Sequence, residues 1–199
     1  MNAKLTIFCL LYISALACKA PKIDPKIIHE QRLKMNNFLQ RSVDEERSVE
    51  FPEGLPFNLL KEYYLVKNKE GVTWQMRPLD VALEFDNPLL LEELLKKNIE
   101  QAVFISRPMM LFNAIDRNKN NCALYLIKHG DLNLNATDFQ GRTPLMFAVS
   151  KNYKIAKALV KAGVRLDIKD SYGKTVLDYA DNKCRTKLLN YKQKNTTTI

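Results

Sequence analysis

The sequence predicts an all-α solenoid of about four helix-turn-helix repeats, with short β-hairpin loops between them and a helical cap over the N-terminal end. Three observations lead to this fold class. A short motif recurs at a fixed spacing, apolar stripes of helical period follow it, and helix-capping residues stand where those stripes begin. Because a pair of short helices cannot bury its own apolar face, stacked copies are needed to form a continuous core.

The composition limits the classes of protein to consider. The chain has 199 residues, with 31 Lys and Arg against 22 Asp and Glu, so its formal net charge is +9. Apolar residues make up 46%, which is ordinary for a folded soluble domain and excludes a polytopic membrane protein and a wholly disordered chain. The basic excess favours an acidic partner or surface.

The repeat motif is clearest near the C-terminal end. Residues 138–148 read Asp-x-x-Gly-x-Thr-Pro-Leu-x-x-Ala, and residues 170–180 carry the same Asp, Gly, Thr, Leu and Ala at a spacing of 32 residues. This pattern resembles the ankyrin repeat, whose period is about 33 residues. The resemblance implies an ankyrin-repeat solenoid that binds other proteins.

Two weaker copies of the motif precede the clear ones. Leu111 and Ala114 lie 34 residues before Leu145 and Ala148, and Ala82 lies 32 residues before Ala114. Apolar helical runs follow each of these segments. We therefore expect the repeats to begin well before the clearest copy.

Helix-capping residues support the repeat pattern independently of the family. Thr143 before Pro144 places a hydroxyl acceptor at a helix N-cap and a preset φ at the first helical position, and Asn87-Pro88 repeats this device. Gly163 follows a helical run, where a left-handed residue ends a helix. Local chemistry thus predicts where several helices begin and end.

The N-terminus has the features of an export signal. Lys4 precedes the uncharged run 5–17, which is shorter than the span of about 20 apolar residues that a membrane helix needs. Ala15 and Ala17 fit signal-peptidase cleavage, and Cys18 directly after them resembles the lipid-modified cysteine of bacterial lipoproteins. Two alternatives remain open, simple secretion and an uncleaved anchor. Removal of residues 1–17 takes away one lysine and leaves a formal charge of +8.

Domain boundaries follow from these patterns. Residues after Cys18 contain two prolines and no apolar periodicity, so they indicate a tether. The expected segments are a signal peptide over 1–17, a tether over 18–25, an N-terminal helical cap region over 26–71, repeats over 72–106, 107–137, 138–169 and 170–193, and a polar tail over 194–199.

Residues 26–71 allow two structures. A helix over 58–66 could cover the first repeat, or residues 63–66 and 72–75 could form a hairpin around 68–71. We favour the helix, because a repeat stack without a cap exposes its first core face.

The sequence contains no constellation of catalytic or metal-binding residues. There is no Cys-x-x-Cys, no His-x-x-x-His, no Gly-x-Ser-x-Gly and no phosphate-binding glycine loop. Cys122 and Cys184 hold the same repeat position two repeats apart, so at about 8–10 Å per helix they are too distant for a disulfide. We expect two buried, reduced thiols, no metal, no cofactor and no enzymatic activity.

The resemblance also implies a binding surface at the hairpin tips and the concave helix face. The family's usual contact positions fall on Phe139, Gln140, Arg142, Ser150, Lys151, Ser171, Tyr172 and Lys174, and in the less regular second repeat on Ser106, Asp116 and Arg117.

Two aromatic residues stand out among these positions. Phe139 and Tyr172 fall on turn tips, which rarely need an aromatic side chain, and aromatic residues are frequent binding hot spots. Alternatively, Phe139 folds back onto its neighbour in the structure.

These expectations lead to a non-enzymatic, monomeric protein of the bacterial envelope that binds another protein. It is lipid-anchored at Cys18 on the periplasmic side, or else secreted, and the predicted export argues against a nucleic-acid partner. By analogy with exported ankyrin proteins, we favour an inhibitor or immunity protein for a secreted or envelope enzyme, such as a toxic hydrolase. The alternatives are an envelope adaptor or scaffold, and an enzyme or small-ligand binder built on residues 26–71.

Overall fold

The computed structural model describes residues 25–45, 51–53, 55, 57–97, 107–129 and 132–196. The chain divides into two compact units, Met1–Lys34 and Met35–Ile199. In the first unit the described residues form the beginning of helix α2 (Pro25–Asp44). The expected signal peptide and Cys18 lie outside the described residues.

In the part of the chain that the structure describes, four helix pairs form the repeats, which confirms the predicted helical solenoid. The pairs are α3 (Pro78–Glu84) with α4 (Pro88–Lys96), α6 (Arg107–Asp116) with α7 (Asn120–His129), α8 (Pro144–Lys151) with α9 (Tyr153–Lys161), and α10 (Val176–Tyr179) with α11 (Asn182–Thr196).

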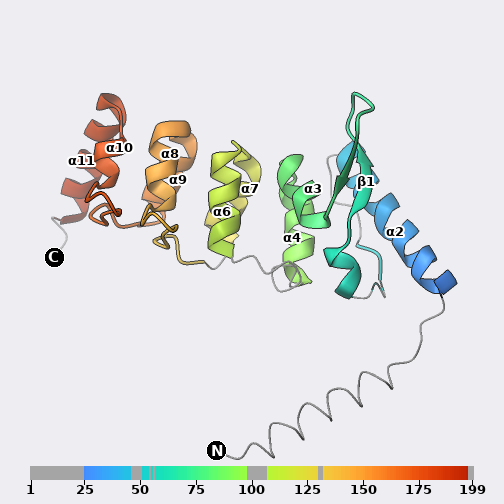
Figure 1. Cartoon of the computed structure of the whole chain (residues 1–199). Coiled ribbons are helices and arrows are strands. Elements are labelled where there is room, and N and C mark those ends of the chain that lie inside the picture. Colours follow the sequence, from blue (N-terminus) through green and yellow to red (C-terminus); the bar gives the residue numbers. More distant parts are fainter. Residues whose placement is uncertain are drawn as a thin grey trace, which may run out of the picture. The chain divides into compact units, whose positions relative to one another are not determined.

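The helices of successive pairs stack in two layers (Figure 1). The first helices α6, α8 and α10 contact one another in order, and so do the second helices α4, α7, α9 and α11. The recurring alanine of the motif lies in the first helix or directly after it and is buried in each repeat, at Ala82, Ala114, Ala148 and Ala180. Because the distance between packed helices depends on the side chains at their contact, a small residue here lets the first helices approach closely.

The predicted N-caps form. Thr143 Oγ1 accepts a hydrogen bond from the backbone N–H of Met146 at 3.4 Å, with Pro144 as the first residue of α8. The Asn87 side chain accepts from the N–H of Leu90 at the start of α4. Asn87 also donates to the Ser42 carbonyl at 2.9 Å, so this cap joins the first repeat to α2.

The expected helix over residues 58–66 does not form, and the hairpin forms instead. A short 3-10 helix, η1 (Phe57–Lys61), is followed by strand β1 (Tyr64–Lys67), which pairs antiparallel with β2 (Thr73–Met76) in the register Val66 opposite Trp74. Asn68 Oδ1 accepts from the N–H groups of Glu70 and Val72, which fixes the turn between the strands. The favoured helix was therefore wrong, because Asn68 closes a turn where that chain segment reverses.

The helical cap itself is present as the second half of α2. The side chains of Met35, Phe38, Leu39 and Val43 are buried and belong to the same apolar cluster as the repeats. The Gln40 side-chain amide donates to the Lys67 carbonyl at 3.1 Å and accepts from the Lys67 N–H at 2.9 Å. The N-terminal cover is therefore a helix and a hairpin together.

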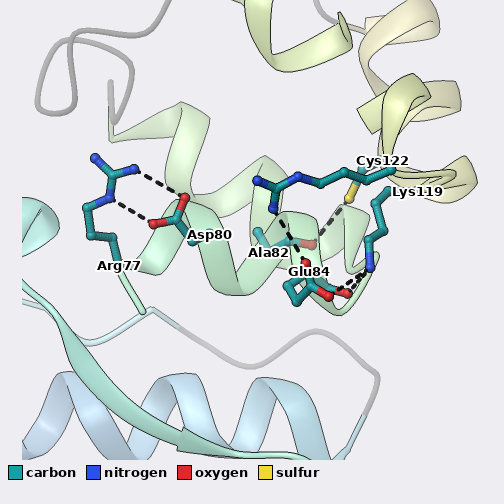
Figure 2. Close-up of polar contacts among 7 residues, drawn as sticks. Arg77, Asp80, Ala82, Glu84, Lys119 and Cys122 are labelled. Atoms are coloured by element: carbon teal, nitrogen blue, oxygen red, sulfur yellow. Dashed lines mark hydrogen bonds and ion pairs between the residues drawn. The ribbon is translucent and has the colours of Figure 1, made fainter. Parts of the chain in front are cut away.

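Both expected thiols are free and buried. Cys122 Sγ donates to the Ala82 carbonyl at 3.4 Å (Figure 2), and burial raises the pKa of both Cys122 and Cys184. Among the described residues, no helix is long and apolar enough to cross a bilayer.

The cysteines give a direct prediction. A thiol reagent added under denaturing conditions without reductant is expected to label both Cys122 and Cys184, and to leave Cys122 unlabelled in the folded protein, because the Cys122 side chain is fully buried. Mass spectrometry counts the labels. Failure to label the denatured chain at these two positions would contradict the free-thiol state.

Candidate protein-binding surface

The turn at residues 138–142 is fixed by a single aspartate. Asp138 Oδ1 accepts from the N–H groups of Gln140 and Arg142, both at 2.9 Å, and the Gly141 N–H donates to the Asp138 carbonyl at 3.0 Å. Gly141 has φ +75°, a left-handed conformation that glycine adopts without strain. The Asp-x-x-Gly of the motif is thus the sequence of a closed turn.

The turn at residues 170–174 has the same construction. Asp170 Oδ1 accepts from the N–H groups of Tyr172 and Lys174, both at 2.9 Å, and Gly173 has φ +74°. Asp170 Oδ2 also accepts a short hydrogen bond from the Tyr179 hydroxyl, which ties this turn to α10. The side chain of Tyr179, nine residues after Asp170, therefore helps to hold the second turn in place.

The two turns are joined through their backbones. The Ser171 N–H donates to the Gln140 carbonyl at 2.9 Å. We call residues 138–142 and 170–174 together the turn pair. Because each turn is closed by its own aspartate and bonded to the other, the turn pair presents its side chains from a fixed backbone.

Two large aromatic side chains project from the turn pair into solvent. Phe139 is 87% exposed and Tyr172 is 72% exposed, the highest values among the exposed large apolar side chains. Phe139 therefore does not fold back onto its neighbour. Between them, Gln140 is half-buried and Ser171 is exposed. An exposed aromatic side chain on an ordered backbone is suited to filling a pocket of a partner.

Arg142 is less available than its position suggested, whereas Lys174 is exposed. The Arg142 guanidinium donates from Nε and Nη2 to Asp138 Oδ2 at 2.9 and 2.7 Å, and lies 4.3 Å from the centre of the Phe147 ring. Lys174 Nζ lies 5.8 Å from the Tyr179 ring. Arg142 therefore fastens the first turn to α8, and its guanidinium is already bound within the chain.

Asp116 and Lys151, two of the expected contact positions, bind each other. Lys151 Nζ lies 2.6 Å from Asp116 Oδ1 and 3.0 Å from the Asp116 carbonyl oxygen. In the preceding repeats Lys119 Nζ binds the Glu84 carbonyl at 2.6 Å and its carboxylate at 3.2 Å (Figure 2). Arg117, a third expected position, reaches Glu84 Oε2 at 3.5 Å. These groups link one repeat to the next.

The remaining expected positions add little to the surface. Ser150 is exposed at the end of α8, and its hydroxyl donates to the Phe147 carbonyl at 3.1 Å. Ser106 lies outside the described residues. The structure therefore brings Phe139, Gln140, Ser171, Tyr172 and the exposed Lys174 together on the turn pair. The charged groups of Arg142, Asp116, Lys151 and Arg117 bind partners within the chain.

Sequence reasoning did not assign a role to the residues that build the turn pair. Asp138 and Asp170 were recognised as members of a motif, but their part in closing the turns was not. Tyr179 and Phe147 were overlooked. Their shared position could have indicated them, because each aromatic residue follows the aspartate of its motif by nine residues.

The described residues hold no cluster of His, Cys, Asp and Glu that could bind a metal ion. Both free cysteines are buried, and burial raises the pKa of each thiol and keeps it protonated. Neither cysteine is therefore suited to act as a nucleophile.

The Tyr179 hydrogen bond predicts a pH-dependent contribution to stability. This hydrogen bond is the largest cause of a lowered pKa of Asp170. The backbone N–H groups of Lys174 and Tyr172 lower the same pKa further. A carboxyl group with a lowered pKa in the folded state stabilises the fold above its unfolded pKa, and this contribution is lost as the pH falls through the folded value. Tyr179→Phe is expected to lower the melting temperature at neutral pH, by an amount that shrinks below about pH 4.

Thermal unfolding followed by circular dichroism between neutral pH and about pH 3 measures this effect. Tyr172→Phe is the matched control, because the Tyr172 hydroxyl does not bond Asp170 and the ring stands in solvent. A Tyr179→Phe deficit of equal size at every pH would contradict the proposed cause.

Comparison with known proteins supports the repeat assignment. A family model described as ankyrin repeats (3 copies) matches residues 79–170 and 111–198, which together cover more than half of the chain. Alpha-latrotoxin-Lhe1a of Latrodectus hesperus is 39% identical over 75 residues, which is 36% of this chain and 5% of the toxin. The chain thus spans only a small part of the length of that relative.

A likeness to solved structures is also found. The ankyrin repeat domain of Bcl-3, a member of the IkappaB protein family, matches with a TM-score of 0.48 and 18% identity, over 70% of this chain and 57% of that one. The repeat motif, the stacked helix pairs and the family match agree. The chain belongs to the ankyrin-repeat family, and its repeats are a protein–protein interaction module.

Proposed function

We propose that this protein binds another protein through the turn pair, with Phe139 and Tyr172 as the central contacts. One observation carries the proposal: two large aromatic side chains stand in solvent on turns that hydrogen bonds hold in place. Ordering a surface before binding reduces the entropy lost on association, and aromatic side chains supply much of the buried area at hot spots.

We further propose that the protein is exported to the bacterial envelope and inhibits a secreted or envelope enzyme there, as an immunity-type protein. The uncharged run 5–17 and Cys18 directly after it support export and a lipid anchor on the periplasmic side. A rigid surface can block an active site by occupying it and needs no chemistry of its own. The inhibitory role rests on analogy with exported proteins of the same family.

A capture experiment tests both levels of the proposal. The chain lacking residues 1–24 is immobilised, incubated with envelope extract, and compared with the Phe139→Ala, Tyr172→Ala double variant. Each protein captured by the first and not by the second is then assayed for hydrolytic activity, alone and with the chain added. We expect such a protein to lose its activity in the complex.

Two other outcomes have clear meanings. A partner whose activity is absent or unchanged in the complex contradicts the inhibitor role and indicates an adaptor that assembles or stabilises envelope proteins. If the immobilised chain and the immobilised double variant capture the same proteins in equal amounts, the turn pair is not the binding surface.

A further inference from the structure

The positive charge of the chain is concentrated on two neighbouring helices. Helix α9 contains three lysines and α11 contains five Lys and Arg, and neither helix contains an Asp or Glu. These eight basic residues nearly account for the net charge of +9. The equivalent helix α4 of the first repeat carries two glutamates and one lysine, so the charge is not a general property of the second helices.

A groove runs between α9 and α11. Its volume is about 270 Å³. Its floor is apolar and consists of buried side chains from both helices, namely Ala156, Val160, Cys184 and Leu188. Helix α11 is the last helix in the layer of second helices. Among the described residues, no further repeat packs beyond it.

Basic side chains line the rim of this groove. Lys157, Lys161 and Lys187 border it, and all three are exposed. Lys187 Nζ lies 4.3 Å from the centre of the Tyr153 ring, which forms one end of the rim. Among the described residues, no carboxylate pairs with Lys157 or Lys161, although most of the other helices carry such ion pairs. Both ammonium groups remain available to an external anion.

We propose that this basic groove is a second docking site and that its occupant is an acidic segment of a partner protein, which inserts an apolar side chain between α9 and α11. The carboxylates of the segment bind Lys157, Lys161 and Lys187, and its apolar side chain covers the floor. An amphipathic helix laid in an apolar groove is a common way for proteins to recognise peptides. This site is separate from the turn pair, whose residues belong to other elements.

The apolar floor decides between the anionic partners that the lysines attract. A phospholipid surface presents phosphates above its acyl chains, and the floor side chains are buried, so they do not project from the protein to reach those chains. A second copy of this chain carries the same positive charge and is repelled at long range. An acidic protein segment supplies both carboxylates and an apolar side chain, so it fits both halves of the groove.

Fluorescence anisotropy tests the proposal with the chain lacking residues 1–24. The probe is a short labelled helical peptide with leucines on one face and glutamates on the other, and a second peptide has serines in place of the leucines. The leucine peptide is expected to bind, and Lys157→Glu with Lys161→Glu to weaken it about tenfold or more, because each reversal replaces an attraction by a repulsion. The serine peptide is expected to bind about tenfold more weakly, because the apolar floor stays uncovered.

Two control variants make the result specific. Lys128→Glu with Lys169→Glu changes the net charge by the same amount on other exposed positions and is expected to leave peptide binding within about twofold. Phe139→Ala with Tyr172→Ala is expected to bind the peptide unchanged, so this test is independent of the turn pair.

Three results would overturn the proposal. The first is equal binding of the leucine and serine peptides, which would mean that charge alone attracts them. The second is an equal loss with both lysine double variants. The third is binding to vesicles that contain phosphatidylglycerol with no binding to the leucine peptide, which would assign the basic groove to a membrane surface.

Discussion

Leu126→Ala is expected to lower the free energy of unfolding by about 3 kcal/mol. Leu126 is fully buried on α7, which packs against α6 in its own repeat and against α4 and α9 in the neighbouring repeats. Removing its side chain leaves a cavity in the centre of the stack, and the surrounding helices on both sides lose contacts. Urea denaturation at neutral pH measures the change.

The control for this substitution is the equivalent leucine at the end of the stack. Leu188→Ala removes a buried side chain of the same size from α11, whose main contact is α9. In a nearest-neighbour solenoid a terminal helix stabilises one interface, so we expect a loss of about 1–2 kcal/mol. A loss at Leu188 as large as that at Leu126 would contradict this description of the core.

Gly141→Ala is expected to cost about 3 kcal/mol, and Gly173→Ala about 1 kcal/mol. The two glycines have nearly the same left-handed φ, +75° and +74°, so the conformational cost of a side chain is shared. They differ in their surroundings. A Cβ at Gly141 would lie 3.1 Å from both Asp170 Cα and the Ser171 backbone nitrogen, whereas one at Gly173 meets no atom within 4 Å.

The extra cost at Gly141 arises because the neighbouring atoms belong to the backbone of the next turn. They can move only if the hydrogen bond between Ser171 and Gln140 is lengthened, so Gly141→Ala should also separate the two halves of the turn pair. Urea denaturation of the two variants provides the comparison. Equal losses would show that the close approach of the two turns has no energetic consequence.

The repeat array could be predicted because its determinants are local. In the clearest copy, Asp138, Gly141 and Thr143 act within five residues of one another, as turn, left-handed residue and N-cap. Their chemistry is readable in the sequence without knowledge of distant contacts. The buried cysteines followed from the same periodicity.

The hairpin before the first repeat was harder to predict because its support is not local. Residues 68–71 read Asn-Lys-Glu-Gly, and this turn has the same hydrogen bonds as the two motif turns, with asparagine in place of aspartate. The strand that precedes it is fixed by Gln40, which lies 27 residues earlier in the chain. The need to cover the first repeat favoured a helix, but it did not show that a hairpin held by Gln40 could provide part of that cover.

The charged residues of the candidate site show a second limit of prediction from the sequence. Arg142, Asp116 and Lys151 occupy positions that the family uses for contacts, but their charges are bound by neighbours in this chain. Lys151 and Asp116 are 35 residues apart, and only the stacking of repeats brings them together. Exposure of Phe139 could be anticipated from its place on a turn, whereas the availability of a charge depends on its partners.

The affinity of the double variant Phe139→Ala, Tyr172→Ala for the captured envelope protein tests the central claim most directly. We expect a loss of about thirtyfold or more, since each residue is a candidate hot spot, with an unchanged melting temperature because neither side chain is buried. Tyr63→Ala, which removes an aromatic side chain that is 58% exposed next to the hairpin, is expected to bind as the unmodified chain does. An unchanged affinity of the double variant would contradict protein binding through the turn pair.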